Sequence, residues 1–170
     1  LLVGIDTEGD NQWDAAARAQ QSFENIYALP KLHAIFGRHG VRPTYVVTWP
    51  VATDERSTQV LRFLKLRGDC EIGAHHHAWE TPPCSPEDVK RHPYAKSLPL
   101  DQFEAQLAQL TAAIAQAVGE PPVSYRSGRF GFDAAHVAAL ERYGYLVESS
   151  VAPLFYEAHK GGPDFVVRFA

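Results

Sequence analysis

The chain has 170 residues, of which 45% are hydrophobic and 21% charged, so it is long enough to form one domain with a substantial core. A formal net charge of -4 gives it no basic field, which makes nucleic acids and anionic membrane surfaces poor candidate partners. No apolar run approaches the length of a membrane span, and no pattern typical of a signal peptide opens the sequence.

We expect a single α/β domain over residues 1–170. The two cysteines, Cys70 and Cys84, do not make a disulfide framework, which favours a reducing compartment, the cytoplasm. The sequence starts within a predicted strand and ends on an apolar stretch, residues 164–170. We therefore expect the domain to be truncated on its C-terminal side.

Predicted strands and helices alternate along the first half of the chain. Residues 1–5 form an apolar run typical of a buried parallel strand, and helical spacing follows over residues 15–38, with a break at Pro30. Residues 44–49 are rich in β-branched and aromatic side chains, which predicts the second strand. A helix is predicted over residues 57–67.

The alternation continues in the second half. Residues 70–74 predict a third short strand, and the proline-rich residues 81–99 predict a long irregular loop. Apolar residues three or four apart over residues 100–118 predict an amphipathic helix that Gly119 ends. The remaining predicted elements are strands over residues 123–125 and 145–151 and, between them, a helix capped by Asp133.

This order favours parallel strand pairing, and in such folds the functional groups gather at the carboxyl ends of the strands. The rule brings residues that are far apart in sequence to one rim. They are Asp6, Glu8, His75, His77, Arg126 and Glu148.

Three consecutive histidines follow the third predicted strand. Alternate side chains of an extended segment point the same way, so His75 and His77 share one face and His76 points away from it. Neutral imidazole is the commonest protein ligand of zinc and similar metals, so the pattern indicates a metal site. The alternative is a surface histidine cluster that binds nothing.

Two imidazoles and a carboxylate, with positions left open, form a hydrolytic metal site rather than a closed structural one. Asp6 and Glu8 are two residues apart, so one can bind the metal while the other accepts a proton as general base. Arg126 is placed to hold that base ionised and oriented. The alternatives are a solvated acidic turn over residues 6–10 and an ordinary ion pair for Arg126.

Aromatic residues accompany this rim. Trp79, Phe130 and Trp49 could line a sugar-binding surface, because aromatic faces suit the apolar faces of sugar rings. Packing in the core is the alternative for at least one of them.

In these motifs the chain resembles the polysaccharide deacetylases of carbohydrate esterase family 4, a group that includes chitooligosaccharide and peptidoglycan deacetylases. The resemblance covers most of the chain in order. It consists of the Asp-x-Glu pair from Asp6 to Glu8, the Glu-Ile-Gly-Ala-His strand over residues 71–75, and the Arg-x-Gly loop that starts at Arg126. Residues 145–151 resemble a later strand usually written Asp-Ser-Ser, with Glu148 in place of the aspartate.

The resemblance implies a distorted (β/α) barrel of about seven strands, incomplete in this chain. It also implies a metal-dependent hydrolase that removes N-acetyl groups from a carbohydrate. The implied roles are Asp6 as catalytic base, Arg126 as its orienting partner, Glu8, His75 and His77 as metal ligands, and Trp79 and Phe130 as substrate contacts. Zinc suits these ligands best, although cobalt, nickel or iron would also bind them.

The chain departs from the family pattern in three places. The usual histidine pair is spaced His-x-x-x-His, but Trp79 stands four residues after His75, so His77 is assigned as the second ligand, with His76 as the alternative. Glu8 replaces the commoner aspartate. No histidine matches the late one that protonates the leaving amine, so we expect that acid beyond Ala170.

Two further classes of function remain open. One is a degenerate sugar-binding module that does not turn over substrate. The other is a hydrolase of a different non-peptide carbon–nitrogen bond, such as that of a cyclic ureide or a formyl amide.

Overall fold

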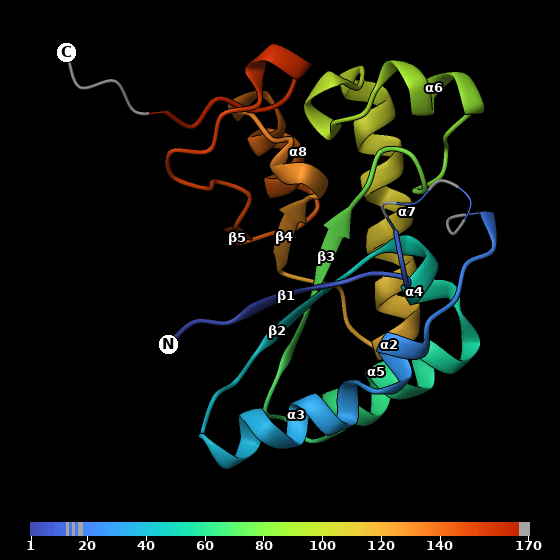
Figure 1. Cartoon of the computed structure of the whole chain (residues 1–170), viewed down its shortest axis with the longest axis vertical. Helices are drawn as coiled ribbons and strands as arrows, with labels where there is room; N and C mark the ends of the chain where they lie inside the picture. Colours follow the sequence, from blue (N-terminus) through green and yellow to red (C-terminus); the bar gives the residue numbers. More distant parts are fainter. Residues whose placement is uncertain (13, 15, 17–18, 167–170) are drawn as a thin grey trace.

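The computed structural model describes residues 1–12, 14, 16 and 19–166. These residues form a five-stranded parallel sheet whose strands lie side by side in chain order (Figure 1). The strands are β1 (Gly4–Thr7), β2 (Thr44–Val47), β3 (Glu71–His76), β4 (Ser124–Ser127) and β5 (Val147–Glu148). Because every neighbouring pair is parallel, each connection crosses back along the sheet, and the crossovers progress in one direction. The α/β class predicted from the alternation is confirmed.

A barrel of about seven strands is not confirmed. The described residues contain five strands, and β1 and β5 stand at the two edges of the sheet. Closure into a barrel and the further strands stay predictions.

Helices occupy most of the connections between the strands. The α-helices are α2 (Glu24–Tyr27), α3 (Leu29–Arg38), α4 (Trp49–Thr53), α5 (Glu55–Leu66), α6 (Pro86–Arg91), α7 (Leu100–Val118) and α8 (Val137–Arg142). Short 3-10 helices are η1 (Ala95–Ser97), η2 (Gly128–Phe130), η3 (Ala134–His136) and η4 (Ala158–Lys160). In the described part of the chain, no helix is both long and apolar enough to cross a membrane.

Helix α7 confirms the helix predicted over residues 100–118, and Gly119 ends it in the left-handed region at φ 88°. The helix predicted over residues 15–38 is interrupted at residues 21–23, which are not helical. From residue 24 on it appears as two helices, α2 and α3, which separate at Ala28 with Pro30 in the first turn of α3. Residues 15, 17 and 18 lie outside the described residues.

Several predictions about local structure were wrong. The strand predicted over residues 1–5 begins only at Gly4, with Leu1 and Leu2 exposed, and the strand predicted over residues 145–151 is reduced to β5. Residues 49–53 form α4 rather than the end of a strand, because a proline in the first turn, here Pro50, starts a helix as readily as it stops a strand. Residues 81–99 are not wholly irregular, since they contain α6 and η1. Helix α6 begins with a capping box in which Ser85 and Asp88 each accept a hydrogen bond from the other's backbone N–H.

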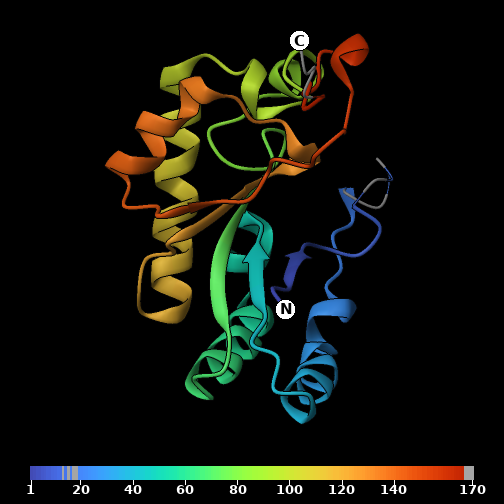
Figure 2. The same ribbon diagram turned by 90° about the vertical axis from the view of Figure 1, so that its left-hand side faces the viewer.

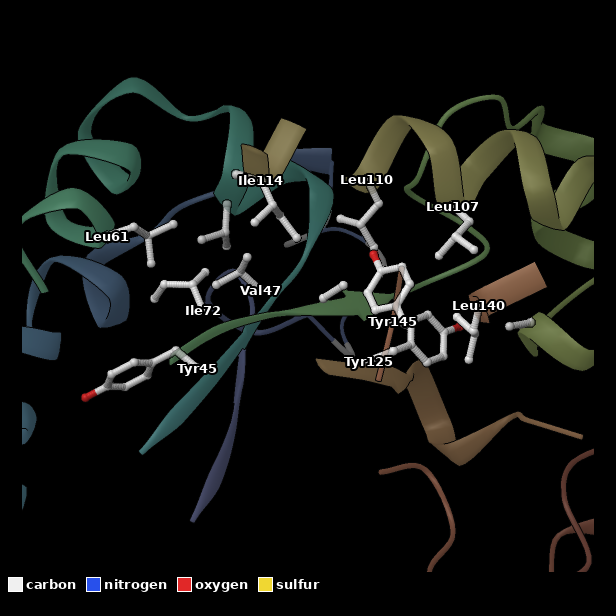
Figure 3. Packing of buried hydrophobic residues seen from close by; sticks show 14 of the residues in the cluster. Tyr45, Val47, Leu61, Ile72, Leu107, Leu110, Ile114, Tyr125, Leu140 and Tyr145 are labelled. Carbon is white, nitrogen blue, oxygen red and sulfur yellow. The ribbon is translucent and has the colours of Figure 1, made fainter. Parts of the chain in front are cut away.

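The main core lies between one face of the sheet and the helices α5 and α7 (Figure 3). Leu61 of α5 and Ile114 of α7 are fully buried near Val47 and Ile72 of the central strands, and Leu110 of α7 is fully buried beside Tyr145. Burying a side chain of this size contributes about 1.5–3 kcal/mol each. This layer fixes β2 and β3, and therefore fixes where the histidines leave the sheet.

The register of the sheet aligns the carboxyl ends of its strands. Asp6 of β1 pairs with Val46 of β2, and His75 of β3 pairs with Arg126 of β4. Helix α6 and the last described residues lie beyond these ends, and α3 lies at the opposite end of the molecule (Figure 2). The polar residues predicted for the rim are thus placed on one side.

Candidate metal and catalytic site

Three ligand atoms converge where β1 and β3 end. The Nε2 atoms of His75 and His77 lie 2.9 Å apart, and Oε2 of Glu8 lies 3.6 Å from the first and 3.2 Å from the second. Both imidazoles are buried, and the three atoms lie within 4.8 Å of one another. The strand alternation therefore places His75 and His77 on one face, beside Glu8, as the spacing predicts.

His76, the alternative ligand, points to the opposite face of the sheet. Its Nε2 lies 2.7 Å from Oε1 of Gln106, and its Nδ1 lies 3.1 Å from the hydroxyl of Tyr125. Complete burial lowers the pKa of His76 to about 3, so the ring is neutral at physiological pH. With both nitrogens engaged in the core, His76 belongs to the packing of α7 on the sheet and not to the metal site.

The converging atoms fit a divalent cation. Nδ1 of His75 lies 3.1 Å from the carbonyl oxygen of Arg126, which can only accept, so Nδ1 carries the proton and Nε2 presents a lone pair. Oε2 of Glu8 is buried and accepts no hydrogen bond from the described residues. Bonds of about 2.0–2.2 Å to a tetrahedral ion separate its ligands by roughly 3.3–3.6 Å, so the observed triangle needs only small shifts.

The carboxylate of Asp6 lies beside this triangle. Its Oδ1 accepts a hydrogen bond of 2.6 Å from Nη1 of Arg126, and its Oδ2 lies 3.9 Å from Nε2 of His75. The Asp6 side chain is 38% exposed, so water can reach it. The structure thus brings Asp6, Arg126 and the three ligand residues together.

Sequence reasoning missed the residues that hold Arg126. Its Nε donates to Oγ of Ser149 at 3.2 Å, and this hydroxyl donates to the carbonyl of Tyr125 at 3.1 Å. The guanidinium also lies over Gly4, where an added Cβ would stand 2.4 Å from Nη2. The Ser-Ser pair of the late-strand motif was the available signal for Ser149.

Gly128 was likewise not singled out for a role of its own. A Cβ at this position would lie 2.1 Å from Cδ2 of the His77 ring and 3.0 Å from the carbonyl oxygen of His76. Only glycine lets the loop after β4 pass this close to His77. The Arg-x-Gly pattern contained this signal.

The two aromatic residues predicted to contact substrate lie in different places. Trp79 packs on His77 with ring centroids 4.2 Å apart, whereas Phe130 packs edge-on against Phe155 with centroids 5.4 Å apart. Trp49 is partly buried against the core, as its alternative predicted. Phe130 lines a cavity of about 280 Å³, and Trp79 is not among the residues that line it. The lining residues are Tyr94, Arg129, Phe130, Phe155, Glu157 and Lys160.

Glu148 stabilises the backbone where β5 ends. Its Oε1 accepts a hydrogen bond of 2.6 Å from the backbone N–H of Ser150, whose hydroxyl in turn accepts one of 2.7 Å from the N–H of Ser127. Burial raises the pKa of the Glu148 carboxyl. These contacts tie β4 to the segment that follows β5.

The amino-acid sequence matches no protein-family model and no curated protein. Solved structures do match. A chitin deacetylase from the fungal pathogen Colletotrichum lindemuthianum superposes with a TM-score of 0.59 over 87% of this chain, at 20% identity. The fold is that of the carbohydrate esterase family 4 deacetylases.

Other proteins with the deacetylase fold match to a similar degree. A peptidoglycan deacetylase from Bacillus subtilis gives a TM-score of 0.54 over 86% of this chain at 14% identity. A pseudoenzyme of the same family from Bacillus anthracis gives 0.56 over 86%, also at 14% identity. The match covers 54%, 55% and 42% of these three chains, so this chain spans about half the length of the solved structures.

Proposed function

We propose that the chain acts as a metal-dependent hydrolase that removes N-acetyl groups from a carbohydrate. The proposal depends on one observation, the position of Asp6 and its partner Arg126 directly beside the converging ligand atoms. A carboxylate base next to ligands with open positions suits metal-assisted hydrolysis. Structures with this fold that are named as chitin and peptidoglycan deacetylases support a carbohydrate amide as the substrate.

The residues of the site have separate roles in the proposed reaction. Glu8, His75 and His77 would hold a divalent ion, which when bound supplies Lewis-acid polarisation of the scissile carbonyl and of water. Asp6 takes a proton from the attacking water through Oδ2, while Arg126 holds Oδ1 and so fixes the carboxylate. The water oxygen bonds to the carbonyl carbon and the carbon–nitrogen bond breaks. The departing amine takes the proton that Asp6 removed from water, which returns Asp6 to its carboxylate form.

Zinc is the proposed metal. Two imidazole nitrogens and one carboxylate oxygen form a set of intermediate softness that zinc occupies in hydrolytic sites. Cobalt, nickel and iron bind the same set and are the alternatives. Within the family barrel that the resemblance implies, this site would lie at the carboxyl end of the strands.

A second candidate function is sugar binding without turnover. One of the matching solved structures is a pseudoenzyme, and a mutant form of it is described as having restored enzymatic activity. This fold therefore occurs with and without catalysis. The His-x-His spacing and the glutamate at position 8 are departures of this chain from the family pattern, and they favour this second candidate.

The test is acetate release from N-acetylglucosamine oligomers by zinc-loaded protein, with Asp6→Asn as the variant and Asp101→Asn, exposed in the first turn of α7, as the matched control. We expect wild type and control to release acetate, and Asp6→Asn to lose about 10²–10⁴-fold in kcat while keeping its metal. Binding of the oligomers without acetate release would favour the second candidate. Turnover of a formyl amide or cyclic ureide instead of the acetylated sugar would overturn the carbohydrate substrate.

A further inference from the structure

The metal site depends on where one proton lies. The Nε2 atoms of His75 and His77 are 2.9 Å apart, a distance at which one ring could donate a proton to the other. In that case Nε2 of His77 would take part in a hydrogen bond to His75 and could not bind a metal. Both rings bind a metal together only if both protons lie on Nδ1. The carbonyl of Arg126 fulfils this condition for His75.

For His77 the deciding group is the carboxylate of Glu80. Its Oε1 lies 3.2 Å from Nδ1 of His77, and its side chain is only 6% exposed. The backbone N–H groups of Glu80 and Thr81 donate to the carbonyl of His77 at 3.3 and 3.1 Å, so the turn after β3 folds back onto the ring. This turn brings the side chain of Glu80, three residues after His77, back to the imidazole ring.

The other oxygen of the Glu80 carboxylate is held by a residue of the turn that follows β1. Nε2 of Gln12, which is 3% exposed, donates a hydrogen bond to Oε2 of Glu80. Gln12 lies four residues after the ligand Glu8, on the segment that leaves β1. The contacts therefore run from Glu8 to His77, from His77 to Glu80, and from Glu80 through Gln12 back to the segment that carries Glu8.

A buried carboxylate facing an imidazole acts on it in two ways. A carboxylate can only accept, so it draws the imidazole proton to the nitrogen that it faces, and it makes the opposite nitrogen a better electron-pair donor. Burial strengthens both effects because little water screens the charge. At His77 the opposite nitrogen faces Oε2 of Glu8, also at 3.2 Å, so the two carboxylates compete for the proton. Glu80 has the stronger hold because its side chain is 6% exposed against 18% for Glu8, and less water screens its charge.

We propose that Glu80 is a positioning residue that sets His77 in its metal-binding tautomer, and that Gln12 fixes Glu80 for this task. The inference rests on the metal site of the proposed function and adds two residues to it. Gln12 bonds to Glu80, and Glu80 faces Nδ1 of His77 on the side of the ring away from Glu8, so both residues act through His77.

The first experiment locates the proton without any metal. Long-range ¹H–¹⁵N correlation spectra of the metal-free protein distinguish the two imidazole tautomers of His77. We expect the proton on Nδ1 in wild type and a shift of population to Nε2 in Glu80→Gln. The matched control is Glu71→Gln. Glu71 is a half-buried glutamate at the start of β3, hydrogen-bonded to Ser124 and Thr44. We expect this variant to keep the wild-type tautomer of His77.

The second experiment measures zinc affinity by competition with a chromophoric chelator. Loss of an outer partner of a ligating histidine typically costs about 10–100-fold in metal affinity, so we expect that loss in Glu80→Gln and a smaller one in Gln12→Ala. Gln12→Ala retains the carboxylate and remains informative should Glu80→Gln fail to fold. Wild-type affinity in both variants, or the Nε2 tautomer in wild type, would overturn the inference.

The two proposals can fail separately. If wild type shows the Nδ1 tautomer, Glu80→Gln changes it, and yet no protein binds zinc, the proposed function fails while the role of Glu80 toward His77 holds. If all variants bind zinc equally, the metal site stands and Glu80 has no positioning role.

Discussion

Nη1 of Arg126 donates a hydrogen bond of 2.6 Å to Oδ1 of Asp6, although the two residues stand 120 positions apart in the chain. The contact joins β1 and β4, which are not neighbours in the sheet, so the sheet must curve enough to bring these two strands within reach of one arginine side chain. Ser149 and the missing side chain of Gly4 make that reach possible. The orientation of the proposed base therefore depends on residues that do not touch the metal position.

Gly4→Ala tests that dependence. The new Cβ would stand 2.4 Å from Nη2 of Arg126, and the guanidinium, as the end of a flexible side chain, would move away at little cost in folding stability. We expect near-normal thermal stability and zinc content but a lower kcat, because Asp6 loses its partner. The control is Gly37→Ala in α3, where a Cβ meets no atom within 4 Å. Unchanged kcat in Gly4→Ala would contradict the role given to Arg126.

Gly128→Ala should weaken metal binding instead of lowering kcat. Its Cβ would lie 2.1 Å from the His77 ring and 3.0 Å from the carbonyl oxygen of His76, and neither the packed ring nor the backbone can move away freely. We expect zinc affinity to fall by at least the roughly 10-fold typical of disturbed ligand orientation, measured by chelator competition. Zinc binding as tight as in Gly37→Ala would show that His77 is not held as described.

His76 gives the protein a predictable acid sensitivity. Burial lowers the pKa of His76 from its ordinary value of 6.5 to about 3, so between these values the unfolded chain binds a proton that the folded chain does not. The free energy of unfolding therefore falls as the pH drops through this window, by at most about 1.4 kcal/mol per pH unit from this group.

Denaturant titrations of wild type and His76→Phe from pH 7 to pH 4 measure this contribution. The variant leaves the buried Oε1 of Gln106 without its hydrogen-bond partner, so we expect it to be less stable at pH 7 by about 1–3 kcal/mol but to lose less stability on acidification. Equal slopes in the two proteins would mean that His76 is not the neutral core residue described.

The part of the site that was predictable from sequence follows from two short rules. The period of two in a strand put His75 and His77 on one face, and the meeting of parallel strand ends put Asp6 and Glu8 next to them. The first rule depends on neighbouring residues and the second on whole strands. Neither prediction therefore changes when the predicted ends of a strand are wrong by a few residues. The amphipathic spacing of α7 is equally local.

The remaining residues could not be predicted in the same way. Gln12, Glu80 and Ser149 act only because distant segments place them there, and a buried glutamate or serine carries no sequence period of its own. The capping box at Ser85 and Asp88 was readable but was outweighed by the surrounding prolines. Pro50 was ambiguous, since the same residue stops a strand and starts a helix.

The central claim is that Glu8, His75 and His77 form one metal site. The most direct measurement is the metal content of the purified protein after reconstitution with zinc and removal of excess ion, by elemental analysis, for wild type, Glu8→Ala, His75→Ala and His77→Ala. We predict about one zinc per wild-type chain and its loss in all three variants, since removal of one of three protein ligands leaves too few to hold the ion. Wild-type protein that retains no zinc, or variants that retain as much as wild type, would contradict the account.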